Sequence, residues 1–279
     1  MAAVEQISRA GRAAALPFWT VGRLRIAALV VIFALWEVAG ASGLFYRGVL
    51  PSSWLVAKAM FGLLASASFW FHAGVTGLEV LAAFAIGCSA GALAGLALGA
   101  NRYAGSVLEP FLHYLAPTPK IVFLPILLIL FGVGMGSKIA LGAISSFFPM
   151  ALGVAAGVRQ VSPVLLRVGR TFSLSRFQIV RMIYLPALVP SLATGLRIGL
   201  GISIVGCLMS EIKLSRMGLG FSAMEYYRVF DIPSMLAVLI FIFFCAALGN
   251  VAIDKLVRLP GPQDRQKRKW SGFTQRFTR

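Results

Sequence analysis

The sequence predicts an all-α protein that crosses a membrane six times. Hydrophobic residues make up 59% of its 279 residues and charged residues only 13%, a balance that soluble domains do not reach. About twenty apolar residues span roughly 30 Å of hydrocarbon. The candidate spans are 26–44, 73–99, 121–132, 139–158, 187–210 and 234–251. The third is short unless residues 111–119 complete it.

The basic residues indicate how these spans are oriented. Six spans place both termini and the even-numbered loops on one side, which holds 18 of the 26 Lys and Arg residues, against six on the other side. Positively charged loops stay in the cytoplasm, so we expect both termini to be cytoplasmic, in a multi-pass protein of the cytoplasmic (inner) membrane. Topology thereby accounts for the net charge of +17, and no nucleic-acid partner is expected.

The chain is predicted to begin with a cytoplasmic tail, residues 1–25, followed by the first transmembrane helix and an external segment, residues 26–72. The tail is not a cleavable signal, because charge interrupts its apolar run and a full-length span follows. Glu37 lies inside the first span, where a carboxylate is costly and faces protein or water. It is either a buried hydrogen-bonding residue or part of a polar path, and we favour the structural role.

The second and third spans carry signals of packing and of a cavity. Glycines recur at every fourth position of the second span, at Gly87, Gly91, Gly95 and Gly99. Small residues at this spacing let another helix approach closely. The third span should begin with a broken helix, because three prolines precede it. Irregular backbone at membrane depth can line a cavity, and residues 117–120 are such a place.

The fifth span contains the polar residues Arg197, Ser203 and Glu211. From a helix start near residue 187, Arg197 lies about 15 Å into the membrane at 1.5 Å per residue. A cation there costs about 2.5–3.5 kcal/mol unless it is paired. Arg197 is either a contact between helices or subunits or a pathway group suited to an anion, and Glu211 poses the same choice. We take Arg197, Ser203 and Glu211 as the candidate translocation path.

No catalytic, metal or cofactor site is indicated. The three cysteines fall inside apolar spans at unrelated spacing, so we interpret them as packing residues, and the two histidines share no ligand pattern. The chain has no Gly-x-x-x-x-Gly-Lys-Ser/Thr loop for a nucleotide and neither the Gly-x-Ser-x-Gly nor the His-Glu-x-x-His pattern of hydrolases. We therefore do not expect an enzyme.

Residues 162–190 form a long connection in which a first helix is predicted to start at Ser162. Its hydroxyl can accept the unsatisfied amides of a first helical turn, and Pro163 is preset for the first helical position. The stretch contains no acid and four arginines, Arg167, Arg170, Arg176 and Arg181. We interpret it as a docking surface for a partner.

A second helix is predicted to start at Ser175, whose partner three positions on is Gln178, the capping-box arrangement. This helix should end near Tyr184, because Pro186 disfavours helical geometry at the residue before it. The two short helices should meet at residues 172–174.

The same stretch keeps the spacing of a known motif. It reads Arg167-Val168-Gly169, Ser173-Leu174-Ser175, Phe177, Leu185-Pro186 and Pro190. This resembles the cytoplasmic coupling loop, or EAA loop, of type I ATP-binding-cassette (ABC) importer permeases, with the pattern E-A-A-x-x-x-G-x-S, an aromatic residue, then L-P-x-x-x-P. The wider chain, about residues 30–258, resembles the nitrate, sulfonate and taurine branch of these permeases. The short motifs that carry this resemblance are at 36–37, 50–52, 117–119, 131–134, 195–197, 210–211 and 218–220.

Two positions depart from the pattern. Arg167 stands where the family has an acid, so a contact that relies on that carboxylate is lost or reversed in sign. Ser173 stands where the family has a turn glycine, and it has less access to left-handed backbone geometry. Either coupling to a standard ATPase is weakened or the partner is co-adapted.

The resemblance implies a six-helix ABC transmembrane type-1 fold, with the core at 73–257, the coupling loop at 159–186 and a basic cytoplasmic tail at 258–279. It implies a permease subunit of an ATP-driven importer that forms the path for a small organic or inorganic anion, such as a sulfonate, taurine or nitrate. The residues it assigns to ATPase coupling are Gly169, Arg170, Phe172, Ser173, Ser175, Arg176, Phe177, Leu185 and Pro186.

The resemblance implies three partners: cytoplasmic ABC ATPase subunits, an extracytoplasmic solute-binding protein, and a second permease copy or relative. The ATPase subunits hydrolyse ATP, and a homodimer of the permease is expected. The alternative function is a self-contained secondary transporter or channel subunit. The scarcity of intramembrane acids for a proton relay and the elaborate cytoplasmic loop both speak against it.

Overall fold

The computed structural model describes residues 18–42 and 48–257, and every regular element within those ranges is helical. The elements are α2 (Phe18–Ala41), α3 (Ser53–Leu64), α4 (Ala67–Ala100), α5 (Arg102–Leu115), the 3₁₀ turn η1 (Lys120–Phe123), α6 (Leu124–Phe131), α7 (Met135–Arg159), α8 (Pro163–Thr171), α9 (Arg176–Ile179), the π turn η2 (Val180–Tyr184), α10 (Leu185–Leu214), α11 (Leu219–Arg228) and α12 (Ile232–Val257).

The predicted all-α membrane fold is confirmed. Five helical stretches in the described ranges are long and apolar enough to cross a membrane, and α5 with η1 and α6 makes a sixth if this bent pair counts as one span. The two parts of the pair meet at 94°. The break falls at residues 116–119, because Pro117 and Pro119 lack the N–H groups that a continuous helix would need.

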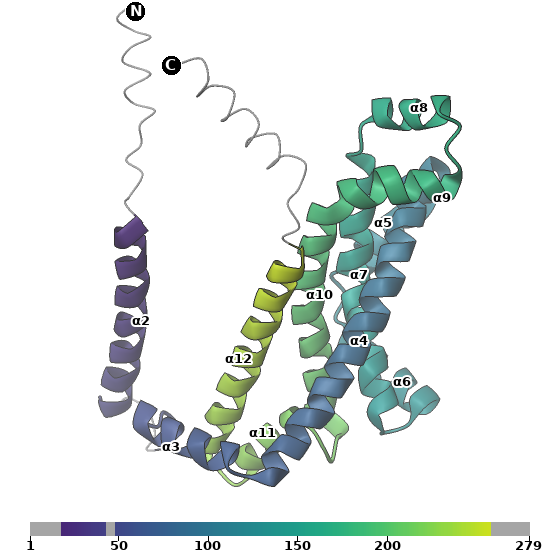
Figure 1. The fold of residues 1–279 in the computed structure, drawn as a ribbon. Coiled ribbons are helices and arrows are strands. Elements are labelled where there is room, and N and C mark those ends of the chain that lie inside the picture. Colours follow the sequence, from purple (N-terminus) through teal and green to yellow (C-terminus); the bar gives the residue numbers. More distant parts are fainter. Residues whose placement is uncertain (1–17, 43–47, 258–279) are drawn as a thin grey trace, which may run out of the picture.

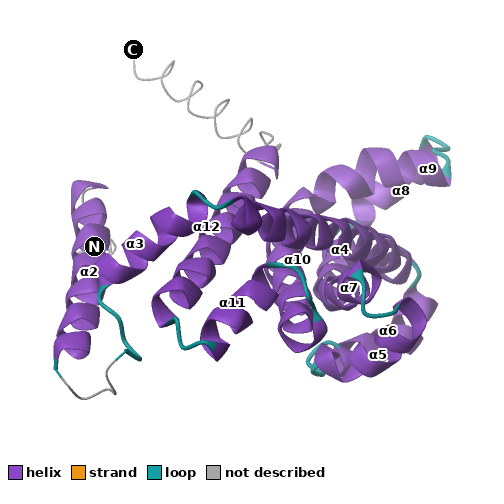
Figure 2. Cartoon of the chain, turned by 90° about the horizontal axis from the view of Figure 1, so that it is seen from below, coloured by secondary structure: helices purple, strands orange, loops and turns teal. Residues whose placement is uncertain are grey.

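The core of the bundle begins with α4 and α7, which lie side by side (Figures 1 and 2). Gly87, Gly91, Gly95 and Gly99 of α4 all face α7, as their spacing predicts. A Cβ atom at Gly91 would stand 2.6 Å from the carbonyl oxygen of Phe147, closer than real Cβ atoms approach. The two backbones are therefore in direct contact. The van der Waals attraction between them depends on the glycines, because any side chain at these positions would push the helices apart.

Helix α10 packs against α7 by the same means. A Cβ atom at Gly206 would lie 2.9 Å from the Cα atom of Gly142, and one at Gly142 would lie 2.7 Å from Sγ of Cys207. Cys88 and Cys207 are buried packing residues, as expected, whereas Cys245 is exposed on α12 and the packing prediction is wrong for it.

The bundle has two distinct ends (Figure 1). One end, called the α8 end, carries α8, the start of α2 and the end of α12, and the opposite end, called the α11 end, carries α3 and α11. Helix α2 stands apart from the bundle and is joined to the start of α3. There Trp36 Nε1 donates to the Pro51 carbonyl oxygen (2.9 Å) and the Ser53 amide donates to Glu37 Oε1 (2.7 Å). This contact favours the structural role of Glu37.

The outer limits of the predicted layout fall partly outside the described residues. Helix α2 begins at Phe18, so the last part of the predicted tail 1–25 is helical. Residues 1–17 and the predicted basic tail at 258–279 lie outside the described ranges.

The predicted end of the second loop helix near Tyr184 is wrong. Helical structure runs without a break from Arg176 to Leu214. In the π turn the amide of Leu185 donates to the carbonyl of Val180, five residues earlier. This wider turn absorbs Pro186, whose missing N–H and ring would otherwise conflict with a regular helical turn.

Replacing Gly91 by Val should separate α4 from α7, because the added side chain meets the Phe147 carbonyl and cannot be accommodated without moving backbone. Overpacking of this kind costs about 1–3 kcal/mol or more. The measurement is thermal unfolding of the purified chain in detergent, where the melting temperature should fall. Gly74→Val on the same helix is the matched control, since nothing lies within 4 Å of a Cβ there. Equal melting temperatures for the two variants would contradict the close contact.

Candidate functional site

The connection between α7 and α10 contains the two helix starts that the sequence predicts. At the first, the Val164 amide donates to Ser162 Oγ (3.3 Å) and Pro163 occupies the first helical turn. At the second, the Gln178 amide donates to Ser175 Oγ (3.3 Å) and the Ser175 amide donates back to Gln178 Oε1 (2.7 Å). This reciprocal capping box is confirmed.

Helix α8 ends in a Schellman turn built on a serine. The Ser173 amide donates to the Arg170 carbonyl (2.9 Å) and the Leu174 amide to the Gly169 carbonyl (3.0 Å), the bond pair that closes this motif around a left-handed residue. Ser173 supplies that residue with φ +51°. The departure from glycine noted in the sequence therefore falls on the one left-handed position of the loop, where a Cβ atom costs about 1–2 kcal/mol.

Helices α8 and α9 project from the α8 end of the bundle (Figure 1), and their exposed side chains are together called the α8–α9 surface. Phe172 and Phe177 are 74% and 72% exposed, and large apolar side chains that are exposed as a group mark a surface that binds a partner or a membrane. The other exposed apolar and basic members are Val164, Leu165, Arg167, Val168, Arg170, Arg176 and Arg181.

Most of the predicted coupling residues lie on this surface. Arg170, Phe172, Ser173, Ser175, Arg176 and Phe177 are all exposed at the turn between α8 and α9. Gly169 is instead buried beneath the surface, where a Cβ atom would lie 2.8 Å from Ile183 Cδ1. Leu185 and Pro186 lie at the start of α10, one π turn away from the α8–α9 surface.

Glu211 belongs to a buried hydrogen-bond network that fixes α11. Thr76 Oγ1 donates to Glu211 Oε1 (2.7 Å), and the amide of Gly220 donates to Glu211 Oε2 (2.6 Å). The Leu219 amide donates in turn to Thr76 Oγ1 (2.7 Å). Gly218 makes the turn with φ +105°, directly against the Glu211 carboxylate, where no side chain fits. Glu211 thus holds the first turn of α11 onto α4 and α10.

A second buried charge contact was not foreseen from the sequence. Lys138 Nζ of α7 donates to Glu79 Oε1 of α4 at 2.9 Å, and the two side chains are 3% and 0% exposed. Lys138 is one of the six basic residues that the charge count places on the external side, and the structure buries it against a carboxylate. The only sequence signals were that Glu79 lies inside the predicted span 73–99 and that Lys138 directly precedes the predicted span 139–158.

The other candidate path residues are also engaged in helix contacts. Arg197 of α10 forms an ion pair with Asp254 of α12, which corresponds to the alternative of a contact between helices. Ser203 is fully buried, and its hydroxyl donates to the Leu200 carbonyl oxygen (2.9 Å). Arg197, Ser203 and Glu211 are all absent from the wall of the pocket described next.

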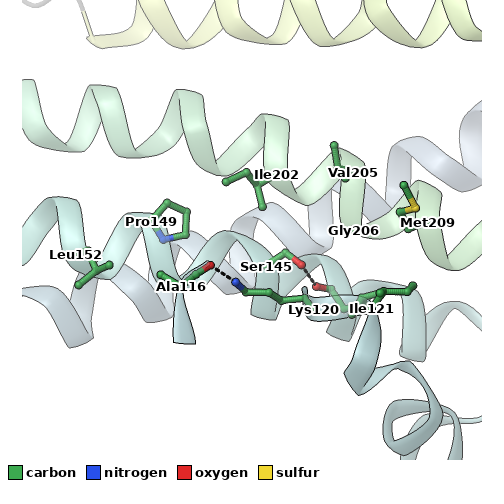
Figure 3. A pocket seen from close by; sticks show the side chains of 11 residues that line it. Ala116, Lys120, Ile121, Ser145, Pro149, Leu152, Ile202, Val205, Gly206 and Met209 are labelled. Atoms are coloured by element: carbon green, nitrogen blue, oxygen red, sulfur yellow. Dashed lines mark hydrogen bonds between the residues drawn. The ribbon is translucent and has the colours of Figure 1, made fainter. Parts of the chain in front are cut away.

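A cavity of about 500 Å³, called the α7–α10 pocket, opens between the break after α5, α7 and α10 (Figure 3). The sequence predicts a cavity at this break. Ser145, in the wall, lies ten residues from the start of α7, about 15 Å at 1.5 Å per residue and so near the middle of roughly 30 Å of hydrocarbon. The lining residues are Ala116, Lys120, Ile121, Leu141, Ser145, Pro149, Leu152, Ile202, Val205, Gly206 and Met209.

Lys120 is the charged residue of this wall. Its Nζ donates to the carbonyl oxygens of Leu115 (3.1 Å) and Ala116, which α5 leaves without intrahelical partners. It also lies 5.0 Å from the centroid of the Phe148 ring, a cation–π distance. Lys120 therefore closes the end of α5 while facing the pocket. Within the described residues, no cluster of three or more His, Cys, Asp or Glu side chains could hold a metal ion.

The helical core that carries both the surface and the pocket matches a known family. The model for the binding-protein-dependent transport system inner membrane component matches residues 83–262. The chain belongs to this family. The match includes the α8–α9 surface and every residue that lines the pocket.

Several curated relatives of this inner membrane component cover most of the chain. The taurine transport system permease protein TauC of Escherichia coli (strain K12) is 29% identical, over 85% of this chain and 90% of the relative. The putative aliphatic sulfonates transport permease protein SsuC of Bacillus subtilis (strain 168) is 29% identical over 86% and 84%. The nitrate import permease protein NrtB of Synechocystis sp. is 28% identical over 86% and 89%. The resemblance to this branch is confirmed.

A solved transporter has the same fold. An inward-facing structure of the MetNI methionine ABC transporter matches with a TM-score of 0.55 and 22% sequence identity, over 74% of this chain and 96% of that chain. The predicted type-1 permease architecture is thereby supported at the level of the fold.

Replacing Ser173 by Gly should stabilise the turn between α8 and α9 by about 0.5–1 kcal/mol, because glycine takes the left-handed conformation without a Cβ clash but loses more entropy on ordering. Hydrogen exchange of the Leu174 amide, which closes the turn, should slow by up to about fivefold. Thr171→Gly, in regular helix two residues earlier, is the control and should speed that exchange. A faster rate in Ser173→Gly would show that the turn is not strained.

Glu79 and Lys138 should stabilise the chain only when both charges are present. Glu79→Gln or Lys138→Met alone leaves one buried charge without its partner and should cost about 3–5 kcal/mol. The double variant removes both charges and should recover a large part of that loss. Thermal melting of the four proteins gives the coupling energy as a double-mutant cycle. Additive losses would mean that the two charges do not interact.

Proposed function

We propose that the chain is the permease subunit of an ATP-driven importer, that it forms the path for a small anion, and that a separate ATPase docks on the α8–α9 surface. The observation that carries the proposal is this surface itself. Two capped short helices hold apolar side chains and arginines in solvent at one end of a membrane bundle. A surface of this composition fits a groove on a soluble partner.

The charge of the surface defines the partner further. Residues 162–190 contain no acid, and Arg167 replaces the acid of the family pattern. A complementary groove must therefore offer carboxylates to these arginines around an apolar pocket for Phe172 and Phe177. We propose that the ATPase is co-adapted to this loop in that way.

Helix α10 provides a route from the docking surface to the pocket. Helical structure continues from Arg176 in α9 through the π turn to Leu214. The same helix packs along α7 and supplies Ile202, Val205 and Met209 to the pocket wall. Movement of α9 by a closing ATPase dimer would be carried along α10 and would change the opening of the pocket, in a rocking of packed helices.

The remaining partners follow from the same proposal. The α8 end, with the start of α2 and the end of α12, faces the cytoplasm in the inner membrane. An extracytoplasmic solute-binding protein delivers substrate to the α11 end, and a second permease copy completes the path. ATP hydrolysis belongs to the ATPase subunits.

Replacing Phe177 by Ala should weaken ATPase docking strongly, because aromatic residues at the centre of an interface each contribute about 2 kcal/mol or more. Binding of the ATPase and ATP-dependent uptake in proteoliposomes should fall by more than about tenfold, with membrane insertion intact. Leu256→Ala is the matched control, because Leu256 is also highly exposed but lies near the end of α12, away from the α8–α9 surface. Undiminished uptake by the Phe177→Ala variant would contradict the proposal.

A further inference from the structure

The chemistry of the α7–α10 pocket restricts what it can hold. Two side chains in its wall have polar groups, Lys120 and Ser145, and the remaining lining side chains are apolar (Figure 3). The Ser145 hydroxyl donates to the Leu141 carbonyl (2.7 Å), so its proton is already committed. A charged Lys120 has three N–H groups, and two of them go to carbonyl oxygens at the end of α5. One N–H group therefore remains for an occupant.

Lys120 also lacks a counter-charge. In the described ranges the ion pairs join Glu79 to Lys138, Glu109 to Arg159 and His113, Glu225 to Arg228 and Asp254 to Arg197, and none involves Lys120. Backbone carbonyls and the Phe148 ring offset part of the cost of this cation, but they carry no full negative charge. One monoanion would neutralise it, whereas a dianion would bring an excess charge into an apolar cavity.

The apolar side chains of the pocket wall favour an occupant that has an apolar part. Ile202, Val205 and Met209 of α10 face the cavity opposite Lys120 (Figure 3). A small inorganic anion such as nitrate would leave these side chains in contact with water. A zwitterion such as taurine would bring an ammonium group for which the wall has no carboxylate. An alkyl chain would instead cover them, strengthening binding by about fourfold for each buried methylene.

We propose that the α7–α10 pocket is the substrate site of the permease, and that it takes an alkyl monoanion whose head group binds Lys120 Nζ and whose chain lies against α10. This inference rests on the proposed transport function and names its substrate class. It assigns the anion contact to Lys120 and not to Arg197 of the fifth span, which is already paired with Asp254.

The test uses the full chain in nanodiscs of neutral phosphatidylcholine, with titration calorimetry of pentane-1-sulfonate against ethanesulfonate, taurine and nitrate, and empty nanodiscs as the blank. Pentane-1-sulfonate should bind most tightly, and ethanesulfonate should bind weaker by about fourfold for each methylene removed. Taurine, which adds only an ammonium group to ethanesulfonate, should bind weaker still. Nitrate or taurine binding as tightly as pentane-1-sulfonate would overturn the substrate class.

Two variants test the site independently. Lys120→Gln should weaken pentane-1-sulfonate binding by more than about tenfold, Lys120→Arg should largely retain it, and Lys58→Gln, an exposed lysine of α3, should not change it. Because Lys120 also closes α5, Val205→Trp provides a second test: it fills the pocket from a half-exposed position and should weaken binding as much without lowering the melting temperature. Wild-type affinity in both Lys120→Gln and Val205→Trp would refute the site.

The outcome separates this inference from the proposed function. If the complex of the chain with its ATPase imports solute with ATP while the pocket variants bind pentane-1-sulfonate as the wild type does, the site is wrong and the importer stands. If the wild-type chain binds pentane-1-sulfonate through Lys120 but no ATPase drives its uptake, the site stands and the importer proposal fails.

Discussion

Glycine faces let α4, α7 and α10 pack with their backbones in direct contact, and both candidate sites are built on this three-helix core. Without the hydrophobic effect to drive helices together inside a bilayer, association depends on close contact and on buried polar bonds. The glycines of α4 supply the contact with α7, and the Gly142–Gly206 crossing supplies that with α10. The pocket wall and the root of the docking loop are held in place by these crossings.

Buried charged side chains join the helices in addition to the glycine contacts. The Glu79–Lys138 pair ties α4 to α7 inside the core, the Arg197–Asp254 pair ties α10 to α12, and Glu211 holds α11. With these groups paired, Lys120 is the charged residue left facing the pocket. The same helix α10 connects that pocket to the α8–α9 surface. One continuous helical segment therefore carries residues for both ATPase docking and substrate binding.

Local signals in the sequence were sufficient for much of this picture. The serine caps of α8 and α9, the glycine spacing of α4 and the proline break before α6 are each set by neighbours within a few residues, and each prediction is confirmed. The end of the helix at Tyr184 was predicted wrongly, because a π turn can absorb Pro186 and leaves no mark in the sequence.

Contacts between distant segments could not be read in this way. Glu79 and Lys138 are 59 positions apart and Arg197 and Asp254 are 57 apart, so no local pattern joins either pair. For Arg197 the sequence indicated only a cost inside its span and did not identify Asp254 as its partner. The sequence placed Lys120 in the broken stretch 117–120 that can line a cavity, but the residues that form the other walls depend on how α5, α7 and α10 assemble.

The most direct measurement of the central claim is hydrogen–deuterium exchange of the full chain with and without its ATPase. The account predicts slower amide exchange at residues 164–177 when the ATPase is bound, with little change in α3 and α11 at the opposite end. Unchanged exchange at residues 164–177 in a complex that still forms would contradict it, because the ATPase would then be docking elsewhere.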